Sequence, residues 1–323
     1  MYLIQSHSSI PYYNIALEDF LLRETDDDYF LIYRNGPSVI IGKHQNTLAE
    51  INYHFIRENN ITIARRISGG GSVYNDSGNL NFSFILNGDP GNLVDYRKYT
   101  LPVIEFLAKS GIKANICGLN SLCAGERKIS GNAARINKKR VLHHGTLLFS
   151  TNLENLFMAL NTRSSKYNSK AIPSLKAEVA NISDLLNEKI SLQQFAGNFA
   201  EFISKKFNCT EFILRGEDEK LIHETETGKF SGWEWNFGYS PDYSFSNEIL
   251  HPDIKISVRL NAEKGIIRDI RITDNAGEHF ALLECMLKNI RHDFDAINHV
   301  MQTSNFENII RGIPVNEFVM GMF

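Results

Sequence analysis

A chain of 323 residues is long enough for one large globular domain, or for a large domain joined to a small one. Hydrophobic residues make up 43% of the chain and charged residues 22%, which is typical of folded domains and excludes a disordered, low-complexity protein. The net charge of −3 argues against a protein that coats nucleic acid or an anionic membrane. Any anion that the chain binds must therefore be held by a local site.

The chain shows neither a secretory leader pattern nor about 18 consecutive apolar residues. We therefore expect a cytoplasmic protein with no nucleic-acid or membrane partner. The four cysteines are Cys117, Cys123, Cys209 and Cys285. They form no CxxC pair and no zinc-like spacing, so the sequence predicts reduced thiols and no zinc site.

The predicted elements begin with an amphipathic helix at 12–24, where apolar residues recur at helical spacing. Apolar runs at 29–33 and 38–42 flank an Asn-Gly-Pro turn and predict a hairpin. The following predicted elements are a helix at 48–59, strands at 61–66, 73–74 and 80–86, a helix at 95–109, and strands at 112–117, 128–134 and 141–149. This order predicts a mixed α/β (α+β) fold with a mostly antiparallel sheet.

The second half of the chain predicts a long loop and a small domain. Residues 161–181 show no periodicity, and so long a loop in a compact domain predicts a lid. Helices are predicted at 182–188, 191–207, 278–290 and 293–302, and strands at 254–260 and 266–272. A linker-like segment at 240–242 divides the chain into a catalytic domain, 1–243, and a C-terminal α/β accessory domain, 244–323.

A glycine-rich run follows the predicted strand at 61–66. In Arg65–Ser72 (RRISGGGS), three glycines let backbone N–H groups approach an anion, and the guanidinium groups supply charge suited to phosphate or carboxylate. The run lacks the GxGxxG and GxxxxGK[ST] spacings, which excludes Rossmann and P-loop sites. By itself it is also compatible with a flexible turn.

A second candidate is the segment 126–132 (ERKISGN). If it is extended, Lys128, Ser130 and Asn132 share one face by the period of two. The Lys128 ammonium is a compact charge that can bridge two anions, although such a segment is also compatible with a solvated charge cluster.

A histidine pair and an aromatic cluster are the remaining candidates for functional residues. His143 and His144 are neighbours on a predicted strand, so they point to opposite faces, and the inward ring is either functional or a satisfied core histidine. The cluster at 233–238 (WEWNFG) could stack on a base or pack in the core. No single motif decides the function.

Taken together and in order, these segments resemble lipoate-protein ligases. The matching stretches are 12–18 (YYNIALE), 33–46 (YRNGPSVIIGKHQN), 65–84 (RRISGGGSVYNDSGNLNFSF), 127–135 (RKISGNAAR), 143–148 (HHGTLL) and 231–238 (SGWEWNFG). The resemblance implies a catalytic domain similar to that of biotin protein ligases, with a small accessory domain. It also implies that lipoate or octanoate reacts with MgATP to give the acyl adenylate and pyrophosphate. A lysine of an acceptor then attacks the adenylate; the implied acceptors are lipoyl domains of 2-oxoacid dehydrogenase complexes and the glycine cleavage H protein.

The resemblance also implies roles for individual residues. Lys128 corresponds to the catalytic lysine that contacts the lipoyl carbonyl and the α-phosphate. The implied ATP and adenylate contacts are Arg66, Gly71, Ser72, Val73, Tyr74, Asn79 and Lys128, and the implied lipoyl contacts are Gly70, Lys128 and His144. Mg²⁺ is expected with ATP; its ligands are unassigned, with Asn120 or Ser121 nearby.

Four segments depart from the family pattern. They are Gly118-Leu119-Asn120-Ser121 for Gly-Arg-Asn-Asp, Asn75-Asp76 for His-Asp, Ala177-Glu178-Val179-Ala180-Asn181 for Ser-Arg-Val-x-Asn, and Asn132 for serine. The change at Ser121 bears on magnesium handling, and the acidic Glu178 bears on closure of the lid over an anionic intermediate.

Three alternatives stay open. A lipoyl or octanoyl transferase of the same fold would need a cysteine shortly after the His-Gly strand, and none lies between Cys123 and Cys209. A biotin protein ligase would carry a GRGRxGR-like loop, which is absent. A catalytically impaired homologue could act as a binding module, for which the four departures are the support.

Overall fold

The structure is a computed structural model that describes residues 1–88, 95–160, 164–175, 177–252, 254–304, 306–310 and 312–323. These residues form two compact units. The first comprises Met1–Lys43, Asn60–Met158 and Ser174–Gly232, and the second comprises His44–Asn59, Ala159–Pro173 and Trp233–Phe323. Within the described residues, no helix is both long enough and apolar enough to cross a membrane.

The first unit contains an eight-stranded sheet in the order β12-β1-β2-β6-β10-β9-β8-β7 and a three-stranded sheet in the order β4-β3-β5. Its strands are β1 (Tyr2–Gln5), β2 (Tyr29–Tyr33), β3 (Ser38–Ile41), β4 (Thr62–Arg65), β5 (Val73–Asn75), β6 (Asn79–Asn87), β7 (Ala114–Cys117), β8 (Ser121–Ala124), β9 (Arg127–Asn137), β10 (Arg140–Leu148) and β12 (Thr210–Glu211). Its helices and helical turns are α1 (Pro11–Arg23), α3 (Tyr96–Lys109), α4 (Leu153–Ala159), η3 (Ile182–Leu185), α5 (Leu192–Phe207), α6 (Gly216–Thr225) and η4 (Glu226–Phe230). Among these strands, three pairs are parallel: β1 with β2, β1 with β12, and β3 with β4. The other pairs are antiparallel. The expectation of a mixed, mostly antiparallel sheet is confirmed.

Strand β6 shows how the sequence divides the large sheet into two faces. Leu80, Phe82 and Phe84 alternate with polar residues and belong to the buried apolar core of the unit. Ser83 points the other way, because its hydroxyl donates to Glu18 of α1. The alternation thus places a core on one face and polar groups on the other.

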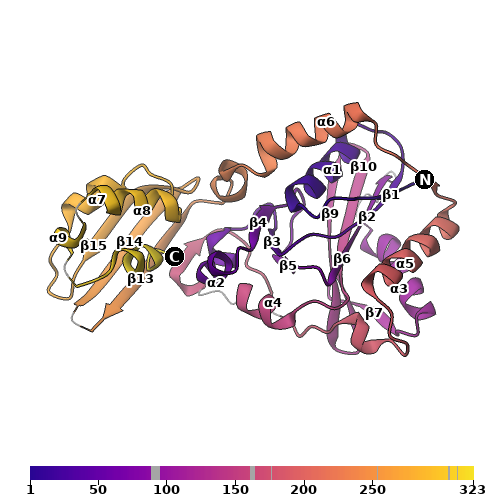
Figure 1. Cartoon of the computed structure of the whole chain (residues 1–323), viewed down its shortest axis with the longest axis horizontal. Coiled ribbons are helices and arrows are strands. Elements are labelled where there is room, and N and C mark those ends of the chain that lie inside the picture. The colour runs from indigo at the N-terminus through magenta and orange to yellow at the C-terminus, as the bar shows by residue number, and fades with distance from the viewer. Residues whose placement is uncertain (89–94, 161–163, 176, 253, 305, 311) are drawn as a thin grey trace. The chain divides into compact units, whose positions relative to one another are not determined.

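Aromatic side chains from two helices fill the apolar side. Phe106 of α3 packs on Phe195 and Phe199 of α5, with ring centroids 5.1 and 4.8 Å apart, and Phe199 also contacts Phe82 of the sheet. Figure 1 shows α3 and α5 on one side of this sheet and α1 on the other. The face covered by α1 is therefore the one that carries the buried polar groups.

The second unit is built on a four-stranded antiparallel sheet, β11-β13-β14-β15. Its strands are β11 (Tyr167–Ser169), β13 (Tyr243–His251), β14 (Ile254–Glu263) and β15 (Ile266–Thr273), and its helices and turns are η1 (Leu48–Glu50), α2 (Tyr53–Glu58), η2 (Ser164–Lys166), η5 (Glu234–Gly238), α7 (Ala281–Leu287), α8 (Phe294–Thr303), α9 (Phe306–Ile309) and α10 (Val315–Met320). Alternate apolar residues such as Ile256, Val258 and Leu260 of β14 are buried. Tyr53 of α2 stacks on Phe323 with a centroid distance of 4.2 Å, so an early segment of the chain is part of this unit.

Several local predictions require correction. The strands at 29–33 and 38–41 are present, but they form no hairpin: β2 pairs with β1 and β6, whereas β3 pairs with β4 and β5. The helix expected at 48–59 is interrupted at Ile51, whose backbone is extended, and α2 restarts after the Asn52 cap. Strands β1, β8, β11, β12 and β13 were not predicted.

The loop at 161–181 is more ordered than its composition indicated. Residues 161–163 and 176 lie outside the described residues. Strand β11 pairs with β13 in the second unit, whereas the segment around Glu178 belongs to the first unit. There Lys128 N donates to Glu178 O at 2.8 Å and Ala180 N donates to Lys128 O at 3.0 Å, so this segment is bound to the backbone of β9. Whether it acts as a lid stays a prediction.

The expectation of four reduced thiols is wrong for two of them. Cys117 and Cys123 form a disulfide across the β7–β8 hairpin, with their Cα atoms 5.9 Å apart. A six-residue separation without a CxxC motif brings two cysteines together when a hairpin folds the chain back between them. Cys209 and Cys285 are free thiols.

Candidate active site

Arg66 holds the glycine-rich loop from inside the first unit. The residue follows β4 directly and is buried, with 6% of its surface exposed. Its guanidinium donates to Gly69 O at 2.5 Å and to Gly71 O at 2.8 Å, and also to Ile40 O at 3.1 Å. Burial lowers the pKa of Arg66 to about 10, which still leaves the group charged at neutral pH. The run at 65–72 is therefore a fixed loop around a buried cation.

The backbone of this loop is shaped for close approach. Gly70 has φ +88°, a conformation that favours glycine, and a Cβ there would lie 3.0 Å from the Arg66 guanidinium. A Cβ on Gly71 would lie 3.0 Å from Ser174 Oγ, and the backbone N–H of Ser72 donates to the same oxygen at 2.8 Å. An acceptor oxygen therefore occupies the position beside the loop where an anion oxygen would bind.

Lys128 supplies a second cation near Arg66. Burial, and next the charge of Arg66, lower the pKa of Lys128. In the described part of the chain, neither cation forms a salt bridge with a carboxylate. A buried cation, Arg66, and a half-buried cation, Lys128, that form no salt bridge among the described residues favour an anionic ligand.

The face expected for Lys128 requires correction. Ser130 and Asn132 do share a face, because their side chains are hydrogen-bonded at 3.2 Å. A β-bulge shifts the register between Leu122 and Cys123, so that Leu122 pairs with Ser130 whereas Cys123 pairs with Lys128. The Lys128 ammonium consequently lies over Gly131, where a Cβ would be 3.2 Å from Nζ. Glycine at 131 leaves room for the cation.

The hairpin tip beside Lys128 is fixed by two asparagines. Asn120 Nδ2 donates to Asn132 O at 2.5 Å, and Asn132 Nδ2 donates to Asn120 O at 3.1 Å. Asn132, one of the departures from the family pattern, therefore anchors this tip. Ser121 follows Asn120 as the first residue of β8 and pairs with Gly131.

Tyr74 and Asn79 frame the turn that follows the loop. Asn79 is fully buried; its Nδ2 donates to Tyr74 O at 3.3 Å, and its Oδ1 accepts from Thr151 Oγ1 at 2.7 Å. Asn79 thus holds the backbone of Tyr74 in place, next to Val73 at the start of β5. The neighbouring Asn75 is fully buried, and neither polar atom of its side-chain amide has a hydrogen-bond partner among the described residues.

The two histidines of β10 face opposite sides, as expected. His143 stacks on Tyr99 with a centroid distance of 5.0 Å, and burial lowers its pKa to about 3, so it is a neutral core histidine. His144 instead faces α1, where its Nδ1 lies 3.0 Å from both carboxylate oxygens of Glu18. Gly145, the next residue, leaves room for Asn132 and Phe82, because a Cβ there would overlap both side chains.

Glu18 is the site residue that our sequence analysis missed. It is fully buried on α1 and accepts hydrogen bonds from Tyr33 at 3.0 Å and from Ser83 at 2.5 Å, besides His144. Burial acts to raise the pKa of Glu18, but His144 and the donated hydrogen bonds outweigh it and hold that pKa below its usual value. A glutamate within a strongly apolar helix was the available signal, because such a group is buried only when it is paired.

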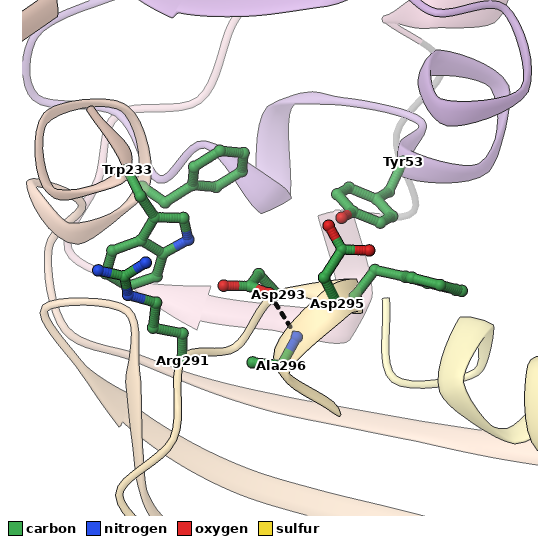
Figure 2. A pocket seen from close by; sticks show the side chains of 8 residues that line it. Tyr53, Trp233, Arg291, Asp293, Asp295 and Ala296 are labelled. Carbon is green, nitrogen blue, oxygen red and sulfur yellow. Dashed lines mark hydrogen bonds between the residues drawn. The ribbon is translucent and has the colours of Figure 1, made fainter. Parts of the chain in front are cut away.

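A pocket of about 430 Å³ lies within the second unit, and none of the residues that the resemblance assigned to ATP, lipoate or Mg²⁺ lines it. It is lined by Tyr53, Trp233, Phe237, Arg291, Asp293, Phe294, Asp295 and Ala296. Figure 2 shows Trp233 and Arg291 on one side, Tyr53 and Asp295 on the other, and Asp293 between them. Its charges are already satisfied, since Arg291 pairs with Glu234 at 2.6 Å and Asp295 with Arg57 at 3.1 Å, while Asp293 caps α8.

Trp233 packs closely in this unit. A Cβ on Gly265 would lie 2.7 Å from the indole of Trp233. The guanidinium of Arg291 also contacts this ring, at 4.7 Å from its centroid. These contacts favour core packing over base stacking for the cluster at 233–238. Among the described residues, no group of three or more His, Cys, Asp or Glu could hold a metal ion.

Two family models match the chain. Residues 10–204 match the lipoyl protein ligase A/B catalytic domain, and residues 240–321 match the bacterial lipoate protein ligase C-terminus. The lipoate-protein ligase LplJ of Bacillus subtilis (strain 168) is 35% identical over 319 residues, covering 96% of each chain. Lipoate--protein ligase 1 of Staphylococcus aureus (strain Mu50) is 34% identical over 316 residues, covering 96% of this chain and 95% of the relative.

Solved structures resemble the chain with a TM-score of 0.63 over 74% of its length. One is a bi-partite lipoate protein ligase of Thermoplasma acidophilum described with its E2 lipoyl domain, 26% identical, of which 96% is covered. Two others, each 27% identical and 98% covered, are a T. acidophilum protein with bound lipoic acid and a lipoate-protein ligase A bound with ATP. Sequence and fold therefore define a protein ligase with a mixed α/β catalytic domain. The chain belongs to the lipoate-protein ligase family, as the resemblance implied.

Proposed function

We propose that this chain is an ATP-dependent lipoate–protein ligase that converts free lipoate or octanoate to the acyl adenylate and transfers the acyl group to a lysine of an acceptor protein. The single observation that carries the proposal is the pair of cations, the buried Arg66 and the half-buried Lys128, that form no salt bridge with a carboxylate in the described chain. They lie beside a glycine loop whose backbone accommodates close contact with an oxygen. The family and the ATP-bound and lipoate-bound relatives support the same assignment.

The chemistry explains why two cations are required. Attack of a carboxylate on the α-phosphate of ATP brings two anions together, and this repulsion opposes the reaction in water. We assign catalysis to Lys128, whose ammonium would stabilise the charge that develops between the two. We assign the nucleotide to Arg66, Gly71, Ser72, Val73, Tyr74, Asn79 and Lys128, and the lipoyl group to Gly70, Lys128 and His144. His144 would line the acyl pocket with its ring carbons, because both of its nitrogens are already bonded.

The acceptor assignment has narrower support. We propose lipoyl domains of 2-oxoacid dehydrogenase complexes and the glycine cleavage H protein as acceptors, and the T. acidophilum ligase with its E2 lipoyl domain supports the first of these. We propose Mg²⁺ as the companion of ATP, with Asn120 or Ser121 near it. We further propose that the enzyme acts in the cytoplasm, where ATP is available, and that the parts 1–243 and 244–323 act as catalytic and accessory domains.

The transferase alternative has less support from the site. A cysteine-dependent transferase needs a free thiolate near the acyl chain, whereas Cys123 is bonded to Cys117. The experiment that separates the alternatives is pyrophosphate release from MgATP with lipoate, octanoate or biotin as the acid. We expect release with lipoate or octanoate and none with biotin. No release with any acid, despite binding of lipoate, would favour the impaired homologue.

A magnesium prediction follows from Ser121. A serine hydroxyl is a neutral ligand where the family commonly provides a carboxylate, and Mg²⁺ prefers anionic oxygen. We expect Ser121→Asp to lower the Mg²⁺ concentration for half-maximal pyrophosphate release by about threefold to tenfold, because one added charge–metal contact is worth roughly 1 kcal/mol at a solvated site. The measurement is a Mg²⁺ titration at saturating ATP.

The control for this titration is Ser110→Asp. Ser110 is the C-cap of α3, and its hydroxyl donates to the backbone carbonyl of Phe106. An equal shift in both variants would mean that added negative charge acts at a distance, and Ser121 would then not lie beside the metal.

A further inference from the structure

Four buried polar side chains form one continuous path of hydrogen bonds in the first unit. Glu18 of α1 contacts Nδ1 of His144 at 3.0 Å, and Nε2 of His144 lies 2.6 Å from Ser68 Oγ. Ser68 Oγ in turn accepts from Arg66 Nε at 3.0 Å. All four residues are buried, with between 0% and 7% of their surface exposed. The path connects a helix on the polar face of the sheet with the loop that contains Gly69 and Gly71.

The residues at the two ends of the path determine the direction in which its hydrogen bonds are donated. Arg66 can only donate, and an ionised Glu18 can only accept. Glu18 therefore requires a proton on Nδ1 of His144, and in the Nδ1–H tautomer Nε2 is an acceptor. Ser68 then donates its hydroxyl proton to Nε2 and keeps its lone pairs for Arg66. In this arrangement each hydrogen bond sets the orientation of the next.

Arg66 transmits this orientation to the loop. Its Nε is held by Ser68, and its Nη2 donates to the carbonyls of Gly69 and Gly71. A guanidinium is planar, so fixing Nε fixes the plane in which the other donors lie. The carbonyl of Gly71 is part of the peptide group whose N–H belongs to Ser72. Rotating the guanidinium therefore disturbs the Ser72 N–H, which donates to Ser174 Oγ.

We propose that Glu18 is a positioning residue for the nucleotide loop, acting through His144 and Ser68 on Arg66. The proposal rests on the proposed function for its effect on ATP, but the path itself is a property of the fold. Glu18 touches neither the loop nor Lys128 in the described contacts. Its role is to select one tautomer of His144 and so to determine which way Ser68 donates.

The decisive variant is Glu18→Gln, which keeps the size of the side chain and removes its charge. Tyr33 and Ser83 both donate to Oε1, so the amide oxygen is best placed there, and the amide NH₂ then faces Nδ1 of His144. The amide NH₂ then opposes a proton on Nδ1, and we expect the imidazole proton to move to Nε2, which turns Ser68 into a double acceptor and weakens its bond to Arg66. Tyr33→Phe is the matched control, since it removes one donor from Glu18 and leaves the path unchanged.

The first measurement is ¹⁵N NMR of the full chain labelled at histidine and arginine, with the His144 and Arg66 signals assigned by substitution. We expect the Nδ1–H tautomer in the natural chain and in Tyr33→Phe, and the Nε2–H tautomer in Glu18→Gln. We also expect hydrogen exchange at Arg66 Nε–H to be at least tenfold faster in Glu18→Gln than in Tyr33→Phe. An Nε2–H tautomer or an imidazolium in the natural chain, or equal exchange in both variants, would overturn the path.

The second measurement is the KM for MgATP in pyrophosphate release. We expect Glu18→Gln to raise KM about tenfold with kcat changed less than threefold, and Tyr33→Phe to change neither more than twofold. In the double variant Glu18→Gln/Ser68→Ala, KM should equal that of Ser68→Ala alone, because both act on one path. Multiplied effects would show that Glu18 acts independently of Ser68. The NMR result stands without turnover, so a chain that fails to adenylate still tests the positioning role.

Discussion

Lys128→Ala is expected to abolish adenylate formation while leaving the fold intact. The ammonium acts on charge that develops only during the reaction, so its loss should lower the rate of pyrophosphate release at least about 100-fold. Stability should not fall. Burial and Arg66 lower the pKa of Lys128, which means that the charged amine is less favourable in the folded chain than in the unfolded one.

This prediction is checked by pyrophosphate release and thermal unfolding on the same preparation. Lys139→Ala is the matched control, because Lys139 is exposed in the turn between β9 and β10, at the other end of the strand that carries Lys128. We expect near-natural turnover in the control. Near-natural turnover in Lys128→Ala would disprove the catalytic assignment.

The second large effect is expected from Gly78→Ala, on stability. A Cβ at Gly78 would overlap the backbone carbonyl of Ser150, and backbone cannot rotate away as a side chain does. The carbonyl of Gly78 also accepts from the N–H groups of Phe149 and Ser150, so relief of the overlap would break hydrogen bonds at the end of β10. We expect a loss of more than about 3 kcal/mol in the free energy of unfolding.

The same substitution in open space provides the control. Gly197 lies in the exposed middle of α5, and a Cβ there would meet nothing within 4 Å. Gly197→Ala should raise stability by about 0.5–1 kcal/mol, because alanine favours the helix. Urea unfolding followed by circular dichroism compares the two. An unchanged midpoint for Gly78→Ala would show that the turn is not tightly packed.

Local patterns in the sequence predicted the elements that they encode directly. The alternation in β6 and the helical spacing of α1 follow from side-chain direction within one element, and both were found. The glycine loop was also recognised, because glycine reports a backbone requirement at its own position. What local patterns could not show was the face of Lys128, since the bulge depends on how β8 pairs with β9.

Contacts between residues far apart in the chain could not be predicted from local sequence patterns. Glu18 and His144 are 126 residues apart, and nothing near either one indicates the other. The disulfide was missed because Cys117 and Cys123 meet only after β7 and β8 fold into a hairpin. The early segment around Tyr53 was assigned to the first domain for the same reason: its partner, Phe323, is at the opposite end of the sequence.

The way in which the chain alternates between its two units limits how they can be separated. Residues 44–59 and 159–173 fold with the C-terminal unit, although each is continuous with residues of the first unit on both sides. A single protease cut after residue 232 would therefore leave α2 and β11 covalently attached to the N-terminal fragment. The C-terminal fragment would lose the strand that pairs with β13 and the ring that stacks on Phe323. A stable excised accessory unit would require circular permutation or grafting of those two segments, so truncation at a domain linker is the wrong design for it.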